Sequence, residues 1–165
     1  MTRRISVIVA SFVVGGWALA SAQSTPSLMG AWRVTEVVVT GANAATNSSP
    51  QPGLYVSTRQ HYSVMTVGGT VARKSPGAPK DPARLTDAEK IAQFEVWNPF
   101  TANSGTYLVT GSTLTLRPLV AKNPGIMGGT QTREFKIDGN TLTLIQKSAA
   151  GQPASETRTK LTRLE

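Results

Sequence analysis

The sequence contains no cysteine and only one histidine among its 165 residues. The lack of cysteine excludes disulfides, thiol catalysis and metal sites built on thiolates. Because His61 is the only histidine, a two-imidazole zinc site is excluded and any Ser-His-Asp arrangement would depend on His61 alone. No serine stands in the Gly-x-Ser-x-Gly pattern of hydrolases. We therefore predict that the protein binds no metal and no cofactor, and we assign no residue a catalytic role.

Acidic residues are scarce, with 9 Asp and Glu against 17 Lys and Arg, for a formal charge of +8. Without Arg3 and Arg4 the chain has 15 basic residues and a charge of +6. The basic residues are mostly single and scattered, whereas nucleic-acid proteins more often gather them in a patch with aromatics between. We predict no nucleic-acid partner. The net positive charge has two remaining interpretations: the basic residues form an ordinary solvated surface, or they attract the protein to an anionic envelope surface.

Residues 1–22 have the composition of a secretory signal peptide. Arg3 and Arg4 precede an uncharged run from Ile5 to Ala20, and Ala20-Ser21-Ala22 offers the small residues that a signal peptidase reads. The run is short for a membrane span, which needs about 20 residues. We expect cleavage after Ala22, or alternatively after Ala20. The mature chain, residues 23–165, is expected to form one exported domain, periplasmic or extracellular, without stable membrane insertion.

The mature chain favours strands over helices. Short runs of alternating or β-branched residues are closed by Gly, Asn or Pro. The pairs Gly111-Ser112 and Gly139-Asn140 indicate hairpin turns. The expected strands cover residues 31–40, 53–57, 61–67, 104–110, 113–120, 129–137, 141–147 and 154–164.

One helix is expected, because Thr86-Asp87-Ala88-Glu89 has the form of a capping box and Asn98-Pro99 ends the segment. The helix follows the third expected strand. Phe94, Trp97 and Phe100 near its end leave two positions open: it caps one mouth of the fold or packs on the outside.

Strands joined by short turns are antiparallel neighbours, and about eight of them can close into a barrel. We therefore predict an all-β fold, a single antiparallel up-and-down β-barrel of about eight strands with one short inserted helix. A barrel of this size is either filled by side chains or holds one small ligand.

Several segments carry a family resemblance. Gly30-Ala31-Trp32-Arg33 resembles the Gly-x-Trp that begins the first strand of lipocalins. The wider set is similar to the bacterial lipocalin-like domain family: Pro52-Gly53-Leu54-Tyr55, Ser104-Gly105-Thr106-Tyr107 with Val109, Asn123-Pro124, Thr130 to Phe135, and Gly139 to Leu144. The resemblance covers nearly all of residues 23–165 and departs in the loops 41–52 and 68–82. It implies a small β-barrel able to bind an apolar ligand.

Gly30 and Trp32 are expected to form a barrel plug. The last strand would return beside the first and bury Trp32, while Gly30 lets the backbone enter tightly. An arginine over the indole would complete the plug through a cation–π contact of about 0.5–2 kcal/mol. Alternation places Arg133 on the inner face with Phe135, so Arg133 is the candidate for this contact.

Arg133 has other possible roles. It is also a candidate anchor for the acidic head of a ligand, or it lies at the rim in water. Alternation places Glu36 inward with Trp32 and makes it a candidate partner of Arg133, although Val37 and Val39 leave room for a bulge that would shift the register. The other ligand-wall candidates are Tyr62, Tyr107, Leu116, Phe135 and Leu144.

The leading interpretation is a secreted lipocalin-like protein that binds or carries a small, apolar or amphipathic molecule in the barrel. One alternative is a cofactor-free isomerase or cyclase, in which His61, Glu36 or Tyr107 handles a proton. Another is a barrel with a filled core that acts as an envelope or interaction protein. The sequence does not indicate an oligomeric state.

Overall fold

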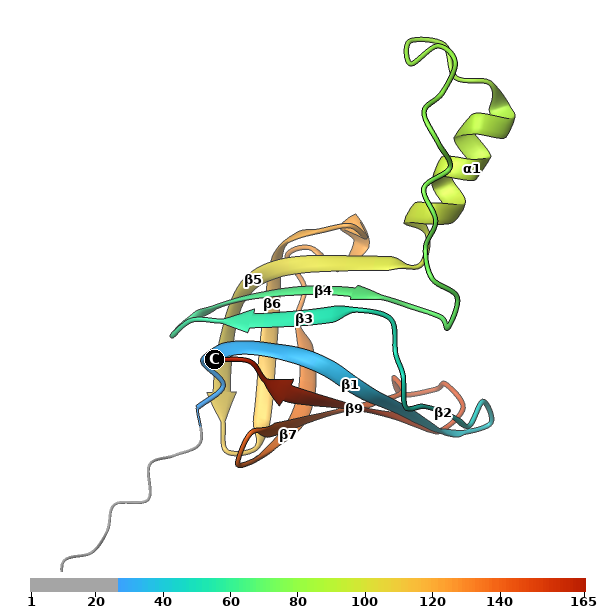
Figure 1. Cartoon of the computed structure of the whole chain (residues 1–165). Helices are drawn as coiled ribbons and strands as arrows, with labels where there is room; N and C mark the ends of the chain where they lie inside the picture. Colours follow the sequence, from blue (N-terminus) through green and yellow to red (C-terminus); the bar gives the residue numbers. More distant parts are fainter. Residues whose placement is uncertain (1–26) are drawn as a thin grey trace, which may run out of the picture.

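A computed structural model of the chain describes residues 27–165 (Figure 1). The signal peptide predicted for residues 1–22 lies outside the described residues. The elements are β1 (Gly30–Gly41), β2 (Ala45–Asn47), β3 (Gly53–Ser57), β4 (His61–Val67), α1 (Asp87–Trp97), β5 (Phe100–Thr110), β6 (Thr113–Ala121), a short 3-10 helix (Pro124–Ile126), β7 (Gln131–Asp138), β8 (Thr141–Lys147) and β9 (Ser155–Arg163). No helix in this part of the chain is long and apolar enough to cross a bilayer.

Eight strands form a closed antiparallel barrel. β1 pairs with β3 on one side and with β9 on the other, and β3 to β9 follow one another around the sheet. The predicted barrel is thereby confirmed. The helix follows β4 rather than the third strand, because the polar loop after β1 contains the additional strand β2. β2 pairs only with Val37–Val39, and its three residues are too few to show an alternation pattern.

The first and last strands meet in the core. Trp32 of β1 and Leu161 of β9 are both 0% exposed. Leu161 lies opposite Val34 in one ladder and opposite Leu142 in the other, so it joins β1 to β8 across the closure. The buried cluster contains Leu28, Trp32, Val34, Tyr62, Val64, Leu114, Leu116, Leu142, Leu144 and Leu161.

A bulge in β1 reverses its alternation. The register against β9 shifts between Val34 and Glu36. Val34 is in the core before the shift, and Val37 packs against the core after it. Glu36 therefore faces outward, where its Oε1 lies 2.7 Å from Lys160 Nζ. The prediction that Glu36 points inward is wrong, because one extra residue exchanges the two faces of a strand.

The capping box predicted for the helix is present. Thr86 Oγ1 accepts the backbone N–H of Glu89, and the Glu89 carboxylate accepts that of Thr86. Lys122 Nζ donates to the Trp97 and Asn98 carbonyls at the other end, where a cation suits the helix dipole.

The helix belongs to an arm that projects from the barrel (Figure 1). This arm, residues 68–99, is inserted into the β4–β5 hairpin, since Val67 pairs with Phe100 and Gly68 N–H donates to Pro99 O at 2.7 Å. No residue of α1 is buried, and Phe94 is 65% exposed. Neither expected position of the helix, capping a mouth or packing on the barrel wall, is correct, because Ala92 and Val96 turn toward the arm's own residues 68–76.

Candidate functional site

The barrel interior is almost filled. Its inner cavity has a volume of about 20 Å³, and a cavity needs about 10–15 Å³ by this measure to hold a water. The interior therefore has room for about one water. Twelve residues line the inner cavity: Leu28, Trp32, Tyr55, Ser57, Tyr62, Val64, Tyr107, Leu114, Leu116, Arg133, Leu142 and Leu144.

Arg133 brings a charge into this interior. It lies opposite Leu114 on β6, and alternation along β7 puts it on the same inner face as Phe135. Its Nη1 lies 3.3 Å from the Tyr55 hydroxyl, which is its hydrogen-bond partner. Its Nε is buried and has no partner, and no carboxylate in residues 27–165 forms an ion pair with it.

Two tyrosines of the inner cavity differ in their hydrogen bonding. The Tyr107 hydroxyl donates to Thr58 O at 2.6 Å. The Tyr62 side chain is 5% exposed, and its hydroxyl has no partner among the described residues. Burial raises the pKa of Tyr62, and the nearby charge of Arg133 partly lowers it. Burial also raises the pKa of Tyr107. Tyr62 therefore presents a free O–H donor to the inner cavity at neutral pH.

The arginine over Trp32 is Arg163, and this corrects the assignment of the barrel plug to Arg133. Arg163 Cζ lies 4.0 Å from the centroid of the Trp32 ring. The β1–β9 register places Arg163 opposite Trp32, whereas Arg133 lies on β7, which does not neighbour β1. Alternation along the last strand puts Arg163 on the same face as the buried Leu161. This pattern in the sequence could have identified Arg163 as the partner of Trp32.

The other members of the plug lie where the sequence analysis placed them. Gly30 begins β1 with a φ of +119°, and a Cβ built there would lie 2.3 Å from the backbone oxygen of Glu165. Trp32 Nε1 donates to Leu28 O at 2.9 Å. Arg163 donates from Nη1 to Met29 O at 2.7 Å and from Nη2 to Ser27 O at 2.8 Å. Residues 27–29, which we term the entry segment, are thus held by side chains of the plug.

A larger opening lies above the inner cavity. This mouth has a volume of about 850 Å³ and is lined by Ser27, Leu28, Met29, Arg59, Gln60, Thr106, Tyr107, Leu108, Val109, Gly111, Ser112, Phe135, Lys136 and Ile137. Most of the large side chains among these residues are apolar, and the charged ones are both basic. Leu28 of the entry segment and Tyr107 of β5 line both the mouth and the inner cavity, so these two residues lie between the two spaces.

The predicted ligand-wall residues do not form one site. Leu116 and Leu144 are buried in the core and line the inner cavity, whereas Phe135 lines the mouth. Tyr62 lies in the inner cavity, and Tyr107 borders both spaces. Of the predicted ligand-wall residues, Glu36 is the one whose side chain lies on the outer face of the barrel.

The three residues considered for proton transfer are not brought together. His61 is exposed on the face of β4 opposite to the buried Tyr62. Glu36 faces outward on β1, and the Tyr107 hydroxyl is already bonded to Thr58 O. Within the described part of the chain, no three His, Asp or Glu side chains gather in a group that could hold a metal ion.

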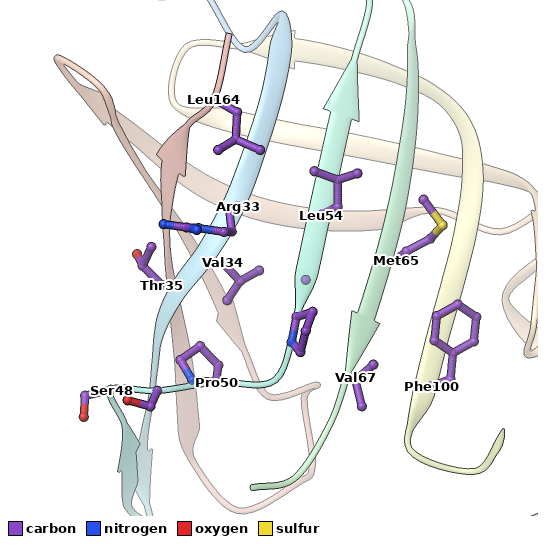
Figure 2. Close-up of a pocket in the computed structure, with 13 residues that line it drawn as sticks. Arg33, Val34, Thr35, Ser48, Pro50, Leu54, Met65, Val67, Phe100 and Leu164 are labelled. Carbon is purple, nitrogen blue, oxygen red and sulfur yellow. The ribbon is translucent and has the colours of Figure 1, made fainter. Parts of the chain in front are cut away.

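The outer wall carries a second apolar surface that the sequence analysis did not identify. Figure 2 shows this outer groove of about 800 Å³ across β1, β3 and β4. Leu54 and Met65 face each other across the β3–β4 ladder, with Leu164 and Phe100 toward its ends. Arg33 is its one charged residue. No unpartnered buried polar atom belongs to the residues of this groove.

Of three comparisons with known proteins, the one with family models gives a match, and this match agrees with the barrel architecture. No curated protein and no solved structure matches the chain significantly. The family model of the lipocalin-like domain matches residues 29–164, which include all strands of the barrel, from the Gly-x-Trp of β1 to the arginine of β9 that covers its indole. The chain therefore belongs to the lipocalin-like domain family.

Proposed function

We propose that this chain is an exported binding protein for a small, largely apolar molecule, which it holds at the mouth of the barrel. The observation that carries the proposal is the mouth itself, an opening of about 850 Å³ with largely apolar walls and two basic residues that leads toward the interior. Small-molecule sites have volumes of about 300–1,000 Å³ and are mostly apolar. Binding would derive from apolar burial, which contributes about 25 cal/mol per Å².

Export rests on the composition of residues 1–22, a basic start followed by an uncharged run and small residues. The lack of cysteine makes the domain indifferent to the redox state of its compartment. The ligand would come from the envelope or from outside the cell.

The small inner cavity favours a second candidate. With room for about one water, the interior also suits a filled barrel that serves as an envelope or interaction protein without a ligand. The two candidates differ in whether the mouth takes up an apolar probe.

The experiment is a titration with the neutral fluorophore N-phenyl-1-naphthylamine, followed by fluorescence. We expect the wild type to bind the probe and Val109→Lys, which places a charge in the mouth, to bind at least about tenfold more weakly. Val120→Lys is the matched control, because Val120 is 61% exposed on β6 and does not line the mouth.

Equal binding by both variants would place the probe elsewhere and refute a site at the mouth. No binding by the wild type would support the filled barrel. Native mass spectrometry of the protein isolated from the exported fraction would then identify a co-purified molecule, or show the mass of the bare chain.

A further inference from the structure

The inner cavity contains a positive charge without a counterion. The Arg133 side chain is half-buried and has one hydrogen bond, to the Tyr55 hydroxyl, and its buried Nε has no partner among residues 27–165. Taking even part of a charged side chain out of water without an ionic partner is unfavourable for folding. A Met side chain, which is apolar and similar in length to the aliphatic part of Arg, would avoid that penalty. Folding alone therefore does not account for Arg133, whereas a bound anion would.

A second unused donor faces the same cavity. The hydroxyl of Tyr62 has no partner among the described residues, and its side chain is more than nine-tenths buried. Arginine offers only donors, and a tyrosine hydroxyl can donate one hydrogen bond. Arg133 and Tyr62 together present N–H and O–H groups to one small space. A carboxylate, with two acceptor oxygens and a negative charge, is the simplest complement to this set.

The order of side chains along β7 defines how such a ligand would lie. Ile137, Phe135 and Arg133 follow one another on the inner face, from the β7–β8 turn toward the interior. Ile137 and Phe135 line the mouth, and Arg133 lines the inner cavity. Along this face of β7, the side chains are thus apolar at the mouth and cationic at the inner cavity. An amphiphile with a single carboxylate fits this order, with its head inside and its tail in the mouth.

Leu28 of the entry segment lies between the two spaces. Because the inner cavity of about 20 Å³ is too small for a carboxylate in addition to a water, a residue between the two spaces must move for the head to enter. The hydrogen bond from the Tyr107 hydroxyl to Thr58 O holds Tyr107 in place, so Leu28 is the residue that moves. The described hydrogen bonds that hold the entry segment to the rest of the barrel come from the side chains of Trp32 and Arg163. The ladder of β1 begins only at Gly30, so the segment can shift without opening the sheet.

We infer that the ligand is a carboxylate-headed amphiphile, whose head passes Leu28 and binds Arg133 and Tyr62. This inference rests on the proposed function, since the tail occupies the mouth. It adds the class of the head, the residues that recognise it and the segment that admits it.

Isothermal titration at neutral pH with decanoate and decan-1-ol tests the inference, because the two probes share a tail and differ in the head. We expect the wild type to bind decanoate at least about tenfold more tightly than decanol. Arg133→Met is expected to abolish this preference and to leave decanol binding within about threefold. Tyr62→Phe is expected to weaken decanoate binding several-fold and to leave decanol unchanged.

Lys136→Met and Arg59→Met are the matched controls, because both residues line the mouth and carry the same charge as Arg133. We expect both to keep the preference for decanoate. Loss of the preference in either variant, with Arg133→Met unaffected, would place the head at the rim and overturn the inference. Circular dichroism establishes that each variant is folded. Arg133→Lys replaces Arg133→Met if the latter is not, and it is expected to keep only part of the preference, because an ammonium makes a weaker, single-point contact.

The outcomes separate the inference from the proposed function. If decanol binds as tightly as decanoate, the inference fails and the proposed function stands. If neither probe binds, the proposed function fails. The role of Leu28 has its own measurement, since Leu28→Ala should raise the association rate of decanoate in stopped-flow experiments. An unchanged rate would exclude Leu28 as the barrier.

Discussion

Arg163 covers the indole ring of Trp32, with its Cζ 4.0 Å from the ring centroid. The two residues belong to the last and first strands, and they face each other in the ladder that closes the barrel. The same guanidinium donates to Ser27 O and Met29 O, so one side chain joins the closure of the barrel to the entry segment.

Arg163→Met is therefore expected to lower the free energy of unfolding by about 1–3 kcal/mol, because it removes a cation–π contact and two charge-assisted hydrogen bonds while it keeps the aliphatic stem. Urea unfolding followed by tryptophan fluorescence measures this change. Arg158→Met on the same strand is the control. Its exposed pair with Glu156 predicts a change below about 1 kcal/mol. Equal effects of the two substitutions would contradict the special role of Arg163.

Gly30 and Gly111 both have positive φ, at +119° and +59°, but differ in surroundings. A Cβ on Gly30 would lie 2.3 Å from Glu165 O, whereas a Cβ on Gly111 would meet nothing within 4 Å. We expect Gly111→Ala to destabilise the protein by about 1 kcal/mol, from backbone strain alone. Gly30→Ala should lower stability by about 2–4 kcal/mol, because steric overlap is added to the strain. Thermal unfolding of the two variants compares them, and similar melting temperatures would refute the close approach at Gly30.

The arm should be dispensable for the stability of the barrel. Val67 and Phe100 already pair at its base, and no residue of α1 is buried. Replacement of residues 69–98 by an Asn-Gly turn is expected to change the free energy of unfolding by no more than about 1 kcal/mol, since little packing is lost and a shorter loop closes at a lower entropic cost. Urea unfolding checks this. A loss above about 3 kcal/mol would show that the arm supports the barrel.

Tyr62 should make stability depend on alkaline pH. Burial raises its pKa in the folded state, while an unfolded tyrosine titrates near pH 10. The folded state therefore holds its proton where the unfolded state releases it, so stability falls as the pH rises above about 10. Below that pH, Tyr62 is protonated in both states and causes no loss of stability. Tyr62→Phe should show a shallower decline between pH 9 and 11 in urea unfolding. If the unfolding free energies of the wild type and the variant fell in parallel with pH, the raised pKa of Tyr62 would be contradicted.

Much of the fold could be predicted because its signals are local. The turn at Gly111-Ser112 and the capping box of Thr86 and Glu89 depend on neighbouring residues alone, and the structure contains both. The inward direction of Arg133 also follows from alternation within β7, a strand without a bulge. The helix shows the limit of such signals. Its start was predictable, but its packing was not, because the capping box does not depend on which neighbour covers the helix.

The sequence by itself determined the eight strands of the barrel, apart from the start of β5 at Phe100, and it also determined the hairpin turns and the capped helix. It did not indicate β2, and it gave an arginine partner for Trp32 only as an expectation. Only the tertiary structure decided that this partner is Arg163, that Glu36 faces outward and that Arg133 forms no ion pair with a carboxylate of residues 27–165. These outcomes depend on the register between β1 and β9, which lie at opposite ends of the chain, and on the bulge between Val34 and Glu36. One residue of shift exchanges the two faces of a strand, and hydrophobic alternation within either strand does not encode the shift between them.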